Sequence, residues 1–263
     1  MTYSSSVQTG APLGVGGIVG ESFSLLMRHF FKIVLLAIVP TLLGTVISGL
    51  LIGWGATLGT SEPVFTTGAD FIPFGLSIIG QLVTYGLTTA LLVQLAYDAK
   101  LERPLELGRY ISPALACAVP IAVLGLVSGI AVALGMILVV IPGLWVYAVF
   151  SVMPAAVVIE RVGFGGLGRS AALTKEYRWP ILGAVILIAI INAVINFVAV
   201  FIVGLVAASM AGSGAGLAAG VIVLTAISAI GFGLSSISIA LIYARLREIK
   251  EGVSLRDIVS VFD

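Results

Sequence analysis

Residues 179 to 210 read WPILGAVILIAIINAVINFVAVFIVGLVAASM, without one charged side chain. A helix needs only about 20 such residues to cross the hydrocarbon core of a bilayer. The uncharged stretch continues to Ala244, and three similar runs extend from Ile33 to Ser61, from Phe71 to Tyr97 and from Tyr110 to Ile159. These runs predict an integral membrane protein built from α-helices.

The composition excludes an ordinary soluble fold. The chain is 60% hydrophobic and 10% charged, with a mean hydropathy of +1.22. Soluble domains are nearer roughly 45 to 50% apolar and 25% charged, with the charges spread over the surface. A transmembrane β-barrel is also excluded, because its strands alternate apolar and polar residues and these runs do not.

The run lengths predict an all-α polytopic protein with about six transmembrane helices in three hairpins. The first two runs hold one span each, and the last two are long enough for two. We expect the turns at Ile141 to Gly143 and at Ala211 to Gly220, because proline and glycine interrupt helices. The expected spans cover residues 33–55, 73–97, 113–137, 143–159, 180–208 and 219–243.

Three segments follow from this division of the chain. Residues 1–13 are polar and predict a disordered tail, residues 14–252 form the six-helix membrane domain, and residues 253–263 form a second tail. All 13 Lys and Arg lie in four segments on the same side of the predicted spans. The positive-inside rule then predicts a multi-pass protein of the inner or plasma membrane with both termini in the cytoplasm.

The two halves of the chain show an ordered, weak repeat. The residues Gly17, Gly20, Ser22, Leu25 and Ile33 recur in the same order and spacing as Gly165, Gly168, Ser170, Leu173 and Ile181, and Phe31 matches Trp179. Repeats of this kind indicate duplicated structural units. We expect each hairpin to be introduced by a cytoplasmic amphipathic segment.

The first of these segments has two faces on a helical wheel. Val19, Phe23 and Leu26 share an apolar face with Phe30, whereas Arg28 lies opposite with other polar residues. Such a pattern is typical of a helix lying in the membrane interface. The alternative is a simple extension of the first span.

Neutral polar residues within the spans are the candidates for a polar path or for contacts between helices. They are Gln81, Gln94, Asn192 and Asn196. Such side chains most often bond to neighbouring helices. No charged residue is expected in the spans, which argues against a proton- or voltage-driven device.

Basic residues beside the spans are the candidates for lipid head-group contacts: Arg28, Lys32, Arg169, Lys175, Arg178, Arg245 and Arg247. Pairing with the acids interspersed among them is the alternative. The expected partners are membrane lipids and, as a further option, other membrane proteins or a second copy of the chain. Nucleic acid is not expected at a net charge of +1.

The sequence offers no recognisable catalytic set. His29 is the only histidine and Cys117 the only cysteine, so neither has a partner of its kind for a metal site. Gly163, Gly165 and Gly168 have the spacing of a dinucleotide motif but lack the strand that the motif needs. We therefore expect no enzyme activity, no cofactor and no metal.

Four segments resemble the glycerophosphoryl diester phosphodiesterase membrane domain, a family of prokaryotic polytopic proteins. They are GESFSLLMRHFF from Gly20, IPGLWVYAVFSVMPAAVVIE ending at Glu160, RSAALTKEYRWPIL from Arg169, and YARLREIKEG from Tyr243. The chain departs from the pattern at Glu102, where glycine is expected. The resemblance implies a stand-alone membrane domain, because the phosphodiesterase activity of fused relatives belongs to a separate soluble domain.

Two functions fit these observations. The first is a non-enzymatic scaffold or accessory protein that acts on membrane lipids or on a membrane complex. The second is a transporter or channel for a lipid, a lipid precursor or a small neutral solute. Prolines such as Pro40, Pro120 and Pro154 favour the second, since broken helices in membranes line cavities.

Overall fold

The computed structural model describes residues 13–59, 61–209 and 214–252, and within these residues every regular element is helical. The elements are α1 (Val15–Arg28), α2 (Phe30–Ile52), α3 (Trp54–Thr57), η1 (Gly68–Asp70), α4 (Phe71–Lys100), η2 (Leu107–Tyr110), α5 (Ile111–Leu138), α6 (Val140–Phe150), α7 (Met153–Ile159), η3 (Gly163–Gly165), α8 (Gly166–Thr174), α9 (Arg178–Ser209) and α10 (Gly214–Glu251). The predicted tails lie outside the described residues except for Leu13, which is buried.

Six helical segments are long and apolar enough to cross a membrane, which confirms the predicted all-α polytopic fold. They cover Phe30–Ile52, Gly68–Lys100, Leu107–Leu138, Val140–Ile159, Arg178–Leu205 and Ala218–Glu251. The fourth segment combines α6 and α7.

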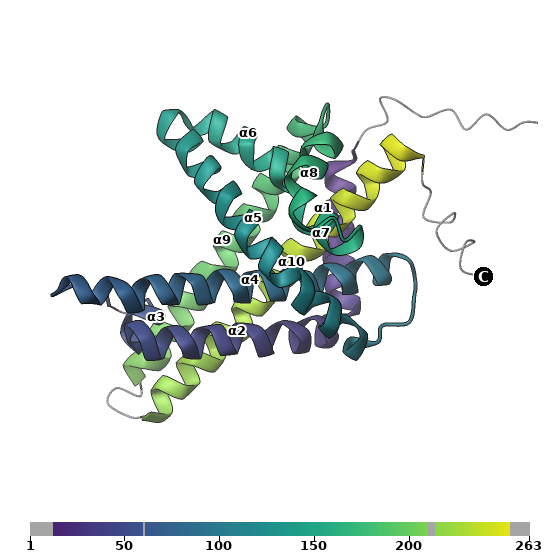
Figure 1. Cartoon of the computed structure of the whole chain (residues 1–263). Coiled ribbons are helices and arrows are strands. Elements are labelled where there is room, and N and C mark those ends of the chain that lie inside the picture. Colours follow the sequence, from purple (N-terminus) through teal and green to yellow (C-terminus); the bar gives the residue numbers. More distant parts are fainter. Residues whose placement is uncertain (1–12, 60, 210–213, 253–263) are drawn as a thin grey trace, which may run out of the picture.

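Consecutive spans pack against each other, and α10 also contacts α2 and α4. In Figure 1, α2 and α4 lie side by side, whereas α5 and α6 run away from them at a steep angle. Large apolar side chains such as Tyr243, Leu92 and Ile33 are fully buried between the helices. Many others face outward, including Leu134 on α5 and Phe197 on α9. Outward apolar side chains suit a lipid environment.

The turn between the third and fourth spans lies at Val139, so the prediction of Ile141 to Gly143 is wrong by two residues. Pro142 instead sits in the first turn of α6. The N–H groups of a first turn have no partner within the helix, so proline costs nothing there. For the other predicted turn, residues 210–213 lie outside the described residues and α10 already begins at Gly214.

The fourth span is broken at Ser151 and Val152, between α6 and α7. Pro154 follows at the start of α7, where it has no N–H to give to the carbonyl of Phe150. The Val149 carbonyl accepts hydrogen bonds from the hydroxyls of two α8 residues, Ser170 at 2.7 Å and Thr174 at 3.2 Å. The short helix α8 therefore compensates for backbone bonding at the break.

The helix α1 lies across α10 and steeply inclined to α2 and α4 (Figure 1). Its buried face carries Ser22 and Leu25, and the Ser22 hydroxyl accepts a hydrogen bond from Ser238 of α10 at 2.9 Å. Phe23, which was predicted to share the apolar face, is exposed. The chain bends at His29 before α2 begins, so α1 is not a straight extension of the first span. Placement of α1 in a membrane interface stays a prediction.

Residues paired by the proposed repeat have similar environments. Ile33 and Ile181 are both buried, whereas Phe31 and Trp179 are 86% and 64% exposed. Ser22 and Ser170 match as well, since both are fully buried. The agreement supports the repeat, which stays a prediction.

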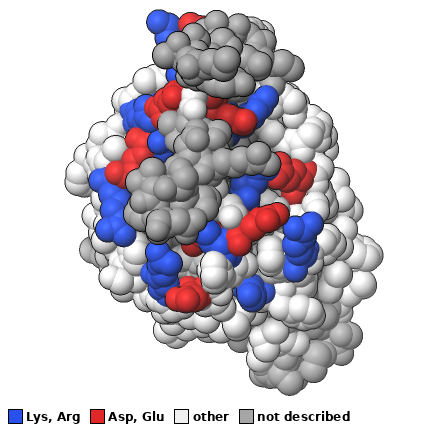
Figure 2. Space-filling model, turned by 90° about the vertical axis from the view of Figure 1, so that its right-hand side faces the viewer, with Lys and Arg blue, Asp and Glu red and all other residues white. Residues whose placement is uncertain are grey.

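Charged side chains gather on one side of the molecule, with both signs interspersed (Figure 2). We call this side the charged face. It is formed by α1 and by the C-terminal ends of α4, α7, α8 and α10, which ion pairs such as Lys100–Glu21 and Arg169–Glu251 join together. The acids therefore do not lie apart from the bases.

Glu102, where glycine is expected, lies just after the end of α4. Glu102 has a φ of +56°, a left-handed conformation that glycine adopts most easily. Glycine is indeed the residue usually found just after a helix ends. Glu102 adopts the same turn at some cost in backbone strain.

The close approach of α4 and α5 at Gly86 generates a prediction. A Cβ atom at Gly86 would lie 2.6 Å from the backbone oxygen of Ala118. We expect Gly86→Ala to force the helices apart and to lower the free energy of unfolding by about 1 to 3 kcal/mol. Thermal unfolding in detergent measures this. The control is Gly75→Ala on the same helix, where the added Cβ meets open space. Equal unfolding temperatures for the two variants would contradict the prediction.

Candidate functional site

A cavity of about 420 Å³, the main cavity, lies between α6, α9 and α10. Its described lining is uncharged and mostly apolar, with Leu144, Ile188 and Ile242 among the contributors. Met136 of α5 also lines it, so four of the spanning segments surround a space large enough for part of a small molecule.

One wall of the main cavity is polar. Asn192 of α9 donates a hydrogen bond from Nδ2 to the Ser235 hydroxyl of α10 at 2.9 Å. The amide packs tightly against Gly231, where a Cβ would lie 2.8 Å from Asn192 Oδ1. Asn192 thus both joins two helices and lines the cavity. Asn196 is exposed, bonds only to the Asn192 carbonyl within the described part, and does not line this cavity.

A second cavity of about 270 Å³ adjoins the first, between α4, α5 and the break of the fourth span. Tyr147, Ser151 and Ile239 line both cavities and so form the partition between them. Gly125 and Gly129 lie on the α5 wall. In the sequence they have the small-xxx-small spacing that permits close helix contact. In the structure no other helix approaches them closely, and they border the second cavity instead.

The two predicted glutamines serve helix contacts. Gln81 of α4 donates to the Ser48 hydroxyl of α2 at 3.1 Å. Gln94 donates to the Ala90 carbonyl at 2.9 Å and to the Tyr110 carbonyl at 3.3 Å, which ties α4 to η2. Neither lines the main cavity or the second cavity.

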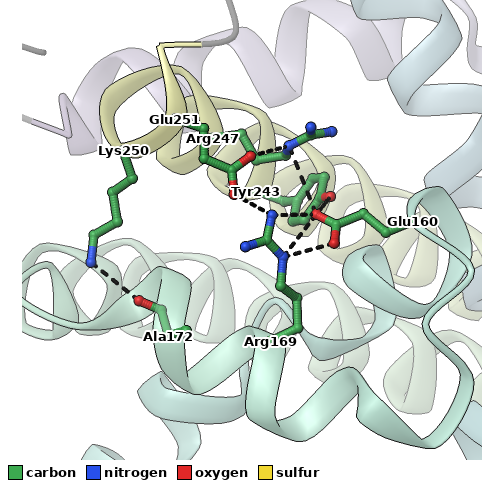
Figure 3. Close-up of polar contacts among 7 residues, drawn as sticks. All are labelled: Glu160, Arg169, Ala172, Tyr243, Arg247, Lys250 and Glu251. Atoms are coloured by element: carbon green, nitrogen blue, oxygen red, sulfur yellow. Dashed lines mark hydrogen bonds and ion pairs between the residues drawn. The ribbon is translucent and has the colours of Figure 1, made fainter.

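A network of ion pairs at the charged face joins α7, α8 and α10 (Figure 3). The Glu160 carboxylate accepts three hydrogen bonds from the Arg169 guanidinium, two of 2.7 Å and one of 3.0 Å, and a fourth from the buried Tyr243 hydroxyl. Arg169 and Arg247 both bond to Glu251 as well. Hydrogen bonding to Glu160 raises the pKa of Arg169 above its ordinary value. This arrangement holds charges in place and leaves no acid free for catalysis within the network.

The predicted lipid contacts therefore divide into two groups. Arg169, Arg247 and Arg245 are paired with acids, Arg245 with Glu248 at 2.6 Å. Arg178 lies over the Trp145 ring at 5.3 Å. The remaining three are Arg28, Lys32 and Lys175. Their side chains are exposed and form no hydrogen bond or ion pair with any described residue.

His29 lies beside two of those free cations. Partial burial, followed by the charges of Lys32 and Arg28, lowers its pKa below the ordinary value of 6.5. The imidazole is therefore neutral at pH 7. No carboxylate is among the groups that shift the pKa of His29. Within the described residues, no cluster of His, Cys, Asp or Glu that could hold a metal ion is present.

Comparison with protein-family models, with curated proteins and with solved structures finds no match to this chain. The resemblance to the glycerophosphoryl diester phosphodiesterase membrane domain consequently stays a prediction.

The Glu160 network generates a prediction about stability. Replacing Glu160 with alanine removes the carboxylate that the Arg169 guanidinium binds, and it leaves the buried Tyr243 hydroxyl without an acceptor. We expect Glu160→Ala to lower the free energy of unfolding by about 2 to 4 kcal/mol. Glu106→Ala is the control, because Glu106 is exposed and unpaired within the described part. Thermal unfolding in detergent compares them, and a loss no larger than the control's would refute a structural role.

Proposed function

We propose that the chain is a non-enzymatic integral membrane protein that binds a membrane lipid and holds one hydrocarbon chain in the main cavity. The observation that carries this proposal is the cavity itself, about 420 Å³ in volume and bounded by membrane-spanning segments. An accessory protein acting on lipids, the first function expected from the sequence, needs such a site.

The cavity can be reached from the lipid phase. Met136 of α5 and Ile186 of α9, two of its lining residues, are 37% and 38% exposed. Both belong to spanning segments, so the space outside them is hydrocarbon. A lipid chain therefore passes from the bilayer into the cavity without crossing water.

The lining determines which part of a lipid binds. Its described residues carry no charge, so a phosphate group would receive no counter-charge at this depth. Apolar side chains match a hydrocarbon chain by hydrophobic contact. Asn192 and Ser235 add a polar patch at which an ester, hydroxyl or amide group is tolerated.

Transport of a lipid or neutral solute is the second candidate. The second cavity favours it, because only the partition of Tyr147, Ser151 and Ile239 separates it from the main cavity. The partition lies at a broken helix, as binding sites of many transporters do. Binding remains the first proposal, since transport requires this partition to open.

The orientation proposed for the chain follows from the charged face. We place this face in the cytoplasm and the chain in the plasma membrane, because the basic residues gather there.

Filling the main cavity tests the function. Ala189 lines it, so Ala189→Phe places a ring where the hydrocarbon chain would lie. We expect the bound lipid in native mass spectra of the detergent-purified chain to fall about fivefold or more. Ala133→Phe on α5 is the control, since Ala133 is exposed and outside the cavity lining. Equal lipid retention in the two variants would remove the main cavity as the binding site.

Reporter fusions test the orientation. Green fluorescent protein folds in the cytoplasm, whereas alkaline phosphatase gains activity only outside it. We expect fluorescence from a fusion after Asp263 and phosphatase activity from an insertion at Ser61, in the loop opposite the charged face. The reverse result would place the charged face outside the cell.

A further inference from the structure

A third cavity, which the proposed function does not use, lies at the charged end of α5. It measures about 260 Å³ and is lined by the first three turns of α5, by Val157 of α7 and by the loop that follows α7. We call it the interfacial groove. Its α5 side includes Ser112, Ala116, Cys117 and Pro120. Part of this wall is exposed at the outer surface of a spanning segment, so the groove borders the lipid phase.

The residues along α5 give the groove its shape. Ala116 and Pro120, one helical turn apart, are short side chains that leave a depression. Their neighbours Leu115 and Val119 are bulky and more than half exposed, so they flank it on the lipid side. The side chains of Ala116 and Pro120 are apolar, which suits contact with a hydrocarbon chain.

The end of the groove nearest the charged face is polar and positive. Arg161 lines it together with the Ser112 hydroxyl. Arg161 is exposed and forms no hydrogen bond or ion pair with any described residue. The acid next to it in sequence, Glu160, is engaged by Arg169 and Tyr243 and is not paired with Arg161. The groove thus presents an uncompensated guanidinium beside a hydroxyl.

The backbone of Arg161 adopts an unusual conformation. Its φ is +54°, a left-handed conformation directly after α7, where glycine is usual. Glu102 and Glu176 share this conformation, so the backbone alone does not mark a site. Because glycine adopts this conformation readily, the variant Arg161→Gly removes the guanidinium without straining the backbone.

We propose that the interfacial groove binds an anionic phospholipid, with its phosphate on Arg161 and Ser112 and one acyl chain along Ala116 and Pro120. Guanidinium groups bind phosphate through charge-assisted hydrogen bonds. The apolar depression that continues from the cation favours a lipid over free phosphate. The proposal does not depend on the main cavity, which shares no residue with the groove and takes only Met136 from α5.

Native mass spectrometry of the full chain in detergent, titrated with phosphatidylglycerol, tests the groove. We expect Arg161→Gln and Arg161→Gly to weaken binding of the first phosphatidylglycerol about tenfold. Arg109→Gln is the matched control, an exposed cation outside the groove lining whose side chain bonds to no described residue, and we expect its affinity to stay within about twofold of the unmodified chain. Arg161→Gly should also unfold at a temperature no lower than the unmodified chain, which shows that lost binding is not lost folding.

Two further arms identify the ligand. Diacylglycerol, which lacks the phosphate, should bind the Arg161 variants and the unmodified chain alike. Inorganic phosphate at the concentration of the lipid should not displace phosphatidylglycerol. Equal weakening by Arg109→Gln, unchanged binding in both Arg161 variants, or full displacement by inorganic phosphate would each overturn the proposal. Loss of the lipid in Ala189→Phe alone would concern only the main cavity.

Discussion

The hydrocarbon core of a membrane accepts neither ions nor unpaired backbone groups, and this constraint accounts for most of the structure. Most charges are gathered at the charged face, with Glu62 and Asp70 in the opposite loop as exceptions, and long continuous helices satisfy their own backbone hydrogen bonds. Where the fourth span breaks, the carbonyl of Val149 is bonded by the hydroxyls of Ser170 and Thr174. The break is therefore stable because α8 packs beside it.

The same break shapes the interior. A straight helix in place of α6 and α7 would bring Tyr147 and Ser151 into a regular packing surface against its neighbours. With the break, these residues instead stand between two cavities. Departure from ideal helix geometry and the presence of a binding space are thus connected.

Hydropathy predicts the spans well because it depends only on the amino-acid composition of each segment. The turns are harder, since the effect of a proline depends on its position: Pro40 and Pro120 lie inside continuous helices, whereas Pro142 and Pro154 lie in first turns. The role of a polar residue is harder still. Gln81 and Asn192 look alike in sequence, but their partners, Ser48 and Ser235, are distant in sequence, and only Asn192 borders the main cavity.

Which cations pair with acids also depends on contacts between residues distant in sequence. For this reason the sequence does not predict the interfacial groove. Arg161 and Arg169 both follow Glu160 closely, and composition ranks them equally. In the fold, Arg169 of α8 and Tyr243 of α10 both donate hydrogen bonds to the Glu160 carboxylate. With its acceptor oxygens engaged there, Glu160 does not pair with Arg161, which remains the free cation beside α5. Tertiary packing of acids therefore decides which bases stay available to an anionic lipid.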